Sequence, residues 1–564
     1  MAEMQEAAPP DDTAIQDWPW RPWVLAGLLG LVALGIHFAT CGNGDVPWRM
    51  AAASFLFFGA IAAAFTLEKD SWKGPAIFAV AIGAVMAGLA WRAVRYGEYL
   101  PDEQYGFAAG VLASGLALPL FQAGFLKRRM ATSYSDLHYH VWTDAISAAG
   151  ALAFTGLSWL VLVLLSALFQ LLKIDVLANL MDEGWFGWTF SGLAFGAALG
   201  TLRNQLKVLG TLQSVLLLVL SLLAVPLALG LTVFLLATVI SGPQVLWDAT
   251  RSATPVLLSC AAGAWVLASA IVRYDDAAMS RNRVMRVAAL VLAAVILPLA
   301  VFAAVSMGLR LGQHGLAPAR LWGLAAIVVA CACGLGFWGA LVRGRKGGWT
   351  ERMRRANFHL GLFVCGLAVV LALPIFDFGA ISTRDQVARL ENGTVPPEMF
   401  DYSALRWDFG KAGQDALERM AASDDETVAS LAAAALEEEF RSYVALRPAE
   451  EFALRVQPDD PELRALVLDY LVRHPWLCSE GCVAIDVGGA DRADGAKRVA
   501  IISGDRAAGF SEVLLAPRRP GQDLNQATRE AALPALTGDS VIEIRTVEKR
   551  YIFVDGKPLS LPLD

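Results

Sequence analysis

The sequence predicts an α-helical polytopic membrane protein of about eleven transmembrane helices, followed by a C-terminal soluble part that is first helical and then α+β. Between Trp23 and Phe376 one apolar segment follows another, and after Asp377 this pattern stops. Hydrophobic residues make up 56% of the chain and the mean hydropathy is +0.50, both above the usage of soluble proteins.

The charge of the chain changes at the same point. Before residue 379 there are 25 Lys and Arg against 21 Asp and Glu, and after it there are 21 against 32. Because an acidic soluble region offers no electrostatic footprint for a phosphate backbone, nucleic acid is excluded as a partner. We expect an acidic tail, a transmembrane domain, a soluble helical segment and a small α+β domain, at residues 1–20, 21–378, 379–475 and 476–564.

The first twenty residues contain several acidic side chains, Pro9 and Pro10, and no Lys or Arg. A secretory signal begins with a positively charged region, so this segment does not fit a cleaved leader. Its composition favours a disordered cytoplasmic tail.

Eleven apolar segments meet the length of about 20 residues that a helix needs to cross about 30 Å of hydrocarbon. Two are too long for one upright helix. The segment from Leu209 to Ile240 contains Pro226, which is expected to kink or divide it. The segment from Trp142 to Ile174 is expected to begin outside the bilayer. The eleven predicted spans are 22–40, 50–67, 75–91, 106–126, 144–172, 185–202, 213–240, 254–272, 287–308, 321–342 and 358–376.

The basic residues orient these spans. With the N-terminus inside, the cytoplasmic segments hold 18 Lys and Arg and the outer loops hold seven. This excess follows the positive-inside rule and predicts a cytoplasmic N-terminus. An odd number of spans then places the acidic tail outside, whereas one split or missed helix would reverse the tail.

The tail changes from a helical to an alternating pattern. Helices are expected near 410–422, 425–443 and 459–473; the second opens on the capping-box pattern Ser423 to Glu426, and the third has Pro461 in its first turn. Strands are then expected at Val483–Val487, Val499–Ile502, Glu512–Leu515, Val541–Val547 and Tyr551–Val554, the last two as a hairpin.

Cys478 and Cys482 are the two cysteines of the tail. Residues four apart at a helix end can have Cα atoms about 6 Å apart, within reach of a disulfide. A disulfide and two free thiols therefore both remain open. A metal site is disfavoured because no His or third Cys completes a zinc set.

Three stretches resemble the bacterial membrane family known as domain of unknown function 4153. They are Trp159 to Ile174, Leu309 to Leu321 and Gln386 to Phe409, and their order and spacing are similar across residues 130–420. The resemblance implies a multi-pass protein of the bacterial inner (plasma) membrane. It implies no activity that can be transferred to particular residues.

The loop that holds Arg310, His314 and Arg320 is a candidate contact for an anion or a lipid headgroup. It is expected on the outer face, and guanidinium groups match the geometry of phosphate. The alternative is a capped turn, because Gly315 and Pro318 punctuate the loop and Pro318 can start the next helix.

Other polar features have ordinary interpretations. Two histidines and two aspartates before the fifth span could ligate a metal, but residues two apart point to different sides of a helix, and anchoring at the interface is favoured. These residues are Asp136, His138, His140 and Asp144. Gly192, Gly196 and Gly200 form a close-packing face whose partner helix the sequence does not identify. Six basic residues at Arg343–Arg355 set topology or hold anionic lipid.

No soluble-enzyme motif is present: the chain has no phosphate loop, no His-Glu-x-x-His, no Gly-x-Ser-x-Gly and no Cys-x-x-Cys. We predict no catalytic residue, cofactor or metal. The favoured function is non-catalytic envelope organisation, or sensing and docking of an envelope protein by an exported tail. The alternatives are a carrier for lipid-linked or apolar substrates, and a membrane enzyme acting on a lipid phosphate near Arg310. Substrate, partner and oligomeric state are left open.

Overall fold

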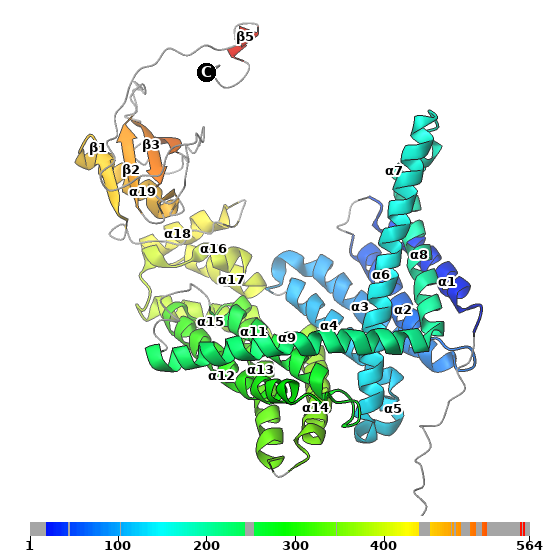
Figure 1. Cartoon of the computed structure of the whole chain (residues 1–564). Coiled ribbons are helices and arrows are strands. Elements are labelled where there is room, and N and C mark those ends of the chain that lie inside the picture. Colours follow the sequence, from blue (N-terminus) through cyan, green and yellow to red (C-terminus); the bar gives the residue numbers. More distant parts are fainter. Residues whose placement is uncertain are drawn as a thin grey trace, which may run out of the picture. The chain divides into compact units, whose positions relative to one another are not determined.

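A computed structural model of the chain forms two compact units, Met1–Glu437 and Glu438–Asp564 (Figure 1). Each unit is described by itself. The structure describes residues 18–42, 46–101, 103–242, 253–345, 347–438, 441, 452–474, 477–478, 481–486, 497–503, 510–515, 553–554 and 557–558. The predicted disordered tail at 1–20 lies mostly outside these residues.

The first unit is helical in the part that the structure describes (Figure 1). Its long helices are α1 (Arg21–Thr40), α2 (Pro47–Thr66), α3 (Lys73–Tyr96), α4 (Glu103–Gln122), α6 (Tyr134–Leu171), α8 (Gly184–Asn204), α9 (Leu206–Ser241), α11 (Thr254–Val272), α12 (Arg283–His314), α13 (Pro318–Arg343) and α14 (Trp349–Ala372). Short elements connect some of them: η1 (Gly97–Tyr99), α5 (Phe125–Arg128), η2 (Arg129–Ala131) and α7 (Val176–Asp182).

Each of the eleven predicted spans corresponds to one long helix, and the polytopic helical fold is confirmed. Among the described residues, ten of these helices are long and apolar enough to cross a membrane. The exception is α8, whose glycines, tryptophans and threonines lower its hydropathy. Apolarity alone therefore supports ten crossings, and α8 has to be judged by its packing.

The division expected at Pro226 is not seen. Helix α9 continues through this proline for 36 residues, and Figure 1 draws it as one unbroken ribbon. A proline in a membrane helix is tolerated when neighbouring groups satisfy the freed backbone carbonyl. Helix α6 has 38 residues and begins at Tyr134, before the predicted start of its apolar part.

Helices α1 and α8 pack with their backbones close together. The three glycines of α8 face α1 in reverse order: Gly192 faces Leu29, Gly196 faces Leu25 and Gly200 faces Pro22. A Cβ atom at Gly196 would lie 2.3 Å from the Leu25 carbonyl oxygen. Only glycine allows this approach, which identifies α1 as the partner of the predicted close-packing face. The two helices run antiparallel over most of their length.

A second core joins α9, α11, α12 and α13. It contains many alanines, such as Ala264, Ala293 and Ala303, beside the fully buried Leu292 and Phe337. Small side chains let membrane helices approach closely, and here dispersion contacts replace the hydrophobic drive that water supplies elsewhere.

Four further helices follow the last span: α15 (Phe378–Glu391), α16 (Tyr402–Trp407), α17 (Gly410–Ala421) and α18 (Glu426–Leu436), with η3 (Pro397–Met399) between the first two. Leu405, Leu417 and Ala432 form their buried core. Helices near 410–422 and 425–443 were predicted; α18 ends earlier, at Leu436, and the side chain that caps it is Asp425 rather than Ser423. Gly410, the first residue of α17, has φ +63°, and a Cβ there would meet the Tyr99 carbonyl oxygen at 2.6 Å. The layer formed by α15 to α18 therefore packs on the α3–α4 connection.

The second unit is a small α+β domain. Strands β1 (Leu454–Gln457), β2 (Cys482–Asp486), β3 (Lys497–Ser503) and β4 (Phe510–Leu515) form a sheet in the order β1-β2-β3-β4. β1 and β2 are parallel and the other pairs are antiparallel. Helix α19 (Pro461–Arg473) connects β1 to β2 and contributes Leu463, Val467 and Leu471 to the buried core.

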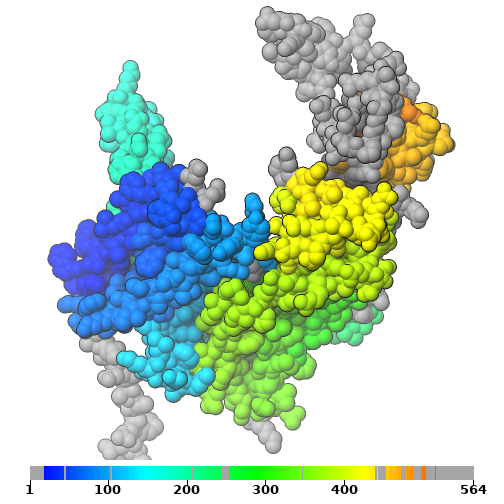
Figure 2. Space-filling view, turned by 180° about the vertical axis from the view of Figure 1, so that it is seen from behind, coloured from blue at the N-terminus to red at the C-terminus, as the bar shows by residue number. Residues whose placement is uncertain are grey.

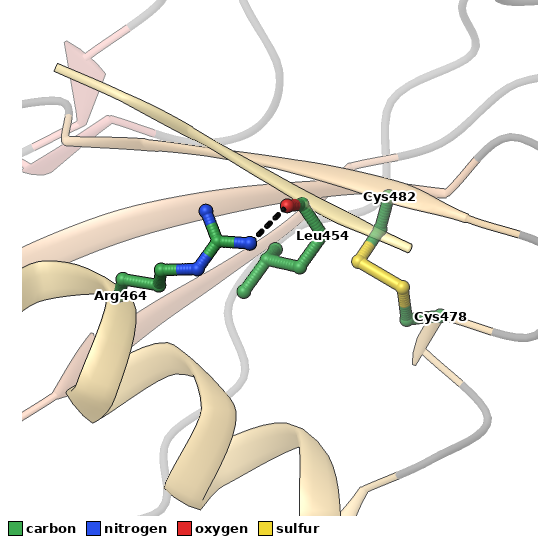
Figure 3. Close-up of a disulfide and its surroundings, with 4 residues drawn as sticks. All are labelled: Leu454, Arg464, Cys478 and Cys482. Carbon is green, nitrogen blue, oxygen red and sulfur yellow. Dashed lines mark hydrogen bonds between the residues drawn. A yellow bond between two sulfur atoms is a disulfide. The ribbon is translucent and has the colours of Figure 1, made fainter. Parts of the chain in front are cut away.

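A disulfide closes this unit at the start of β2. Cys478 and Cys482 are joined with Cα atoms 5.2 Å apart (Figure 3). Beside it, Arg464 of α19 donates a hydrogen bond to the Leu454 carbonyl oxygen at 3.1 Å, which ties the helix to the parallel edge strand.

Most of the predicted tail elements have counterparts. Helix α19 begins at Pro461 with Asp460 as its cap, and β2, β3 and β4 overlap the predicted strands. β5 (Phe553–Val554) pairs with β6 (Lys557–Pro558), whereas the strand predicted at 541–547 lies outside the described residues. Strand β1 was not predicted. Helix α19 shares one buried core with the sheet, and the boundary expected at residue 475 stays a prediction.

Candidate functional site

The loop between α12 and α13 is held by side chains of α15. The Leu316 amide donates to Asp385 at 2.6 Å, and the Gln386 amide group donates to the carbonyl oxygens of His314 and Leu316, both at 2.8 Å. The guanidinium of Arg389 donates to the Gln313 carbonyl oxygen at 2.8 Å. We call this set of contacts, from Asp385, Gln386 and Arg389 to residues 312–316, the clasp.

The clasp depends on one glycine. Gly315 has φ +69°, and a Cβ there would lie 2.5–2.7 Å from atoms of Gln386, Arg389 and Asp385. A side chain at this position would be strained by the left-handed backbone and would also push α15 away.

The three predicted anion-contact residues lie at this loop. Arg320 donates to the carbonyl oxygens of His314 at 2.9 Å and Gly315 at 2.6 Å. Its guanidinium thus caps the C-terminal end of α12, where the last carbonyl groups lack helical partners and carry partial negative charge. Arg310 is partly exposed and His314 is exposed. The capped-turn alternative accounts for Arg320, and an anion contact through Arg310 and His314 stays a prediction.

A buried ion cluster joins the ends of α1, α2 and α8. The carboxylate of Glu68 accepts from Arg21 at 2.6 Å and from Arg203 at 2.8 Å. Arg21 also donates to Asn204 and to the Arg203 carbonyl oxygen, while Arg203 donates to the Ala64 carbonyl oxygen. Both guanidinium groups are nearly buried, and a buried positive charge is costly unless a negative charge pairs with it. The carboxylate of Glu68 supplies this negative charge.

Arg354 is one of the six basic residues predicted to set topology or bind lipid at Arg343–Arg355. In the structure it is buried, and it donates to the carbonyl oxygens of Val272 at 3.0 Å and Arg273 at 3.2 Å. It also donates to Asp276 at 2.8 Å. Arg354 therefore caps the end of α11 and is not available to lipid headgroups.

The pKa of Asp276 is lowered because Arg354 and Thr350 donate hydrogen bonds to its carboxylate. A depressed folded-state pKa gives stability that is complete above the unfolded value, about 3.9, and that is lost as pH falls through the folded value. We expect Asp276→Asn to cost about 1 kcal/mol at pH 7. The difference from the wild type should shrink below pH 4 in thermal unfolding of the detergent-solubilised protein. A gap that stays constant across this range would contradict the ion-pair origin.

A polar network connects α6, α11 and α14. Asn357 donates to the Tyr134 hydroxyl at 3.3 Å and to Ser269 at 3.2 Å, and accepts from Trp265 at 2.9 Å. His138 is buried beside Tyr134 and Tyr274. The start of α6 is thus fixed against the end of α11.

The predicted metal alternative finds no support in the geometry. His138 faces this network, Asp136 accepts from Arg128 at 3.0 Å, and Asp144 accepts from Gln122 at 3.3 Å. Among the described residues no three His, Cys, Asp or Glu side chains are grouped to hold a metal ion.

An apolar cavity of about 410 Å³ lies between α3, α4, α5 and α14. Its wall includes Phe78, Phe121, Leu126, Met130 and Leu362. The rings of Phe78 and Phe121 stack with centroids 4.3 Å apart. Sequence reasoning missed this cavity because its lining comes from α3, from residues 117–130 and from α14, which are far apart in the sequence.

Comparison with known families gives one match. The family described as "Domain of unknown function (DUF4153)" matches residues 52–420. The chain belongs to the DUF4153 family. The matched region runs from α2 to α17 and so contains the clasp, the apolar cavity and the glycine face of α8. Comparisons with curated proteins and with solved structures gave no match.

Two of the three stretches that carry the resemblance meet in space. The loop within Leu309 to Leu321 and the start of the Gln386 to Phe409 stretch form the clasp. Ala317 also packs against the core of α16 to α18. The region that matches the family thus includes the residues that fasten α15 to the α12–α13 loop.

Proposed function

We propose that this DUF4153 protein is a multi-pass protein of the bacterial inner membrane that holds its C-terminal unit outside the cytoplasm for docking or sensing. Its role in this proposal is non-catalytic. The observation that supports this proposal is the clasp. Three side chains of α15, the first helix after the last span, hold this helix on the loop between α12 and α13.

The contacts group the helix ends on two faces. One face, called the basic face, holds the Arg21–Glu68–Arg203 cluster and the Asn357 network. Gln122 joins the end of α4 to the end of α2 by donating to the Phe65 carbonyl oxygen. The opposite face, called the clasp face, holds the clasp and the contact of Gly410 with Tyr99.

These groupings support eleven crossings. Helix α8 runs antiparallel along α1, from Gly184 beside His37 to Gly200 beside Pro22, so it crosses wherever α1 crosses. Helix α9 starts after α8 on the basic face, and α11 ends there, so α9 crosses once. Helix α14 then starts on the basic face and ends on the clasp face. The positive-inside rule assigns the basic face to the cytoplasm.

Reporter fusions test this topology. Alkaline phosphatase fused after Asp564 is expected to be active, whereas a fluorescent protein that matures only in the cytoplasm is expected to stay dark there. Truncated fusions isolate α8: a phosphatase after Asp175 should be active and one after Gln205 inactive. Activity at both positions would remove α8 from the crossings and would put the C-terminal unit in the cytoplasm.

The disulfide agrees with an exported unit, since disulfides persist in oxidising compartments. After acid quenching of cells and denaturation of the protein, Cys478 and Cys482 should resist a thiol-reactive polyethylene glycol reagent until a reductant is added. Closing so short a loop contributes about 2 kcal/mol at most. Cys482→Ser is therefore expected to leave the protein in the membrane and to weaken only the second unit. Reaction of both cysteines without reductant would contradict export.

Docking itself requires contact with another protein. A photo-crosslinking amino acid at Arg455, exposed on β1, is expected to yield a discrete adduct in living cells, and one at Ile240, exposed on α9, is not. Identical adduct patterns from Arg455 and Ile240 would count against docking.

A carrier for apolar or lipid-linked substrates is the second candidate, and the apolar cavity favours it. A carrier needs a path between the two faces. The cavity instead takes its lining from the basic-face ends of α3 and α4, at Phe78 and Phe121, and from α5. Lipid scrambling by the reconstituted protein would favour the carrier over docking.

A further inference from the structure

The apolar cavity has an interfacial segment as one wall. Leu126 and Met130 line it and are 70% and 69% exposed, and they flank Lys127, Arg128 and Arg129. Apolar side chains interleaved with basic ones are typical of a segment at the boundary between hydrocarbon and headgroups. The cavity therefore borders the headgroup layer of the basic face.

Basic residues adjoin the lining residues in the sequence, and we assign them to the rim of the cavity. Lys127 and Arg129 are exposed, whereas Arg128 is paired with Asp136. On α14, Arg355 and His359 lie on the same stripe as the lining residues Leu362 and Gly366, because these positions repeat at intervals of four and three. Arg355 stands about 10 Å along the helix from Leu362, toward the basic face.

Two acidic residues close to these basic side chains are engaged. Asp136 pairs with Arg128 at 3.0 Å, and Glu351 pairs with Arg355 at 3.0 Å. Lys127, Arg129 and Lys73, which precedes Phe78 on α3 by five residues, leave an excess of positive charge. The lining is almost entirely apolar and the volume is within the range of ligand pockets.

We propose that this cavity binds one anionic glycerophospholipid from the surrounding leaflet. An acyl chain fills the space between Phe121 and Leu362, and the phosphate contacts Lys127 and Arg129. Apolar lining with basic residues on one side matches a lipid chain with a charged head. A neutral apolar molecule would leave the basic rim unused, and a soluble anion would leave the cavity unfilled. This site is independent of the docking function.

The space-filling view agrees with a lateral position. At its lower edge, Figure 2 shows the cyan surface of the segment around α5 beside the green surface of later helices. The lipid would lie between α3 and α4 on one side and α14 on the other. It would thus strengthen the contact between early and late helices of the bundle, which also involves Met86, Leu89 and Ala372.

The test uses the full chain in a neutral detergent, with phosphatidylglycerol or phosphatidylcholine added. Native mass spectrometry is expected to retain one phosphatidylglycerol per chain, and the lipid should raise the Tm of the wild type. Phosphatidylcholine should do so only at a concentration at least tenfold higher. Inorganic phosphate should have no effect.

Two variants address the two ends of the lipid. Gly366→Phe fills the cavity, since a Cβ there meets nothing within 4 Å, and Lys127→Gln with Arg129→Gln removes the exposed charges. In each variant, the phosphatidylglycerol concentration that gives half of the maximal Tm shift should be at least tenfold higher than in the wild type. Gly339→Phe, on α13 and equally open, is the matched control and should behave as the wild type. The double glutamine variant changes only exposed side chains, so its fold is preserved.

Several results would overturn the proposal. The first is an equal Tm shift with the two lipids. The second is that both variants bind phosphatidylglycerol as the wild type does. The third is that Gly339→Phe loses the lipid as Gly366→Phe does. If only Gly366→Phe loses the lipid and the double glutamine variant does not, the headgroup assignment is wrong and the site is not selective for anionic lipid.

Discussion

Gly196→Ala is expected to destabilise the protein, although alanine is the better helix former. The added Cβ would lie 2.3 Å from the Leu25 carbonyl oxygen and 2.8 Å from the Ala26 Cα, both backbone atoms that cannot turn aside. Helices α1 and α8 would have to separate along their whole contact. Overpacking of this kind costs about 1–3 kcal/mol, more than the gain of about 1 kcal/mol in helix propensity.

Thermal unfolding in detergent, followed by fluorescence-detected size exclusion, measures this effect as a lower Tm. Gly339→Ala in α13 is the matched control, because a Cβ there meets nothing within 4 Å. The control should keep or raise the Tm, whereas Gly196→Ala should lower it. A stabilising Gly196→Ala would mean that α1 and α8 are farther apart than the structure has them.

Glu68→Gln is expected to cost about 2–3 kcal/mol. Removing one partner of a buried ion pair typically costs about 3–5 kcal/mol, and the partial exposure of Glu68 reduces this figure. Arg21 and Arg203 have side chains only 7% and 13% exposed, so the substitution leaves two guanidinium groups with no carboxylate. The ends of α1, α2 and α8 should loosen together.

The exposed pair Arg128–Asp136 provides the control for Glu68. Its side chains are 58% and 46% exposed, and Asp136→Asn should cost less than about 1 kcal/mol. Combining Glu68→Gln with Arg203→Gln should cost less than the sum of the two single changes, because the second removes a charge that the first left unpaired. Strictly additive effects would show that Glu68 is not held by Arg203.

The membrane part could be predicted because each span is a local pattern. An apolar run of sufficient length forms a helix in lipid whatever its neighbours are, since every backbone group must be satisfied within it. The same locality explains the tail helices, where Asp460 and Pro461 mark the start of α19. Strand β1 was missed because four residues carry too little periodicity, and its parallel partner β2 lies beyond a helix in the sequence.

The roles of single polar residues could not be predicted, because they depend on contacts between distant segments. Arg320 looks equally suited to a lipid phosphate and to the carbonyl groups at a helix end, and only the fold shows that His314 and Gly315 accept its hydrogen bonds. Arg354 was one of six basic residues in a loop by sequence, yet it caps a helix 82 residues away. The apolar cavity could not be predicted either, because its lining residues come from segments that are distant in the sequence.

The clasp has a mechanical consequence. A partner that pulls on the second unit would exert tension on the chain after Leu436, and that force would enter the packed helices α16 to α18 before it reached α15. Gln386 and Arg389 would then transmit part of the load to the turn at Gly315, and so to α12 and α13. Helices α12, α13 and α14 would then share a force that α14 would otherwise bear alone. The second unit would thus be anchored through three membrane helices.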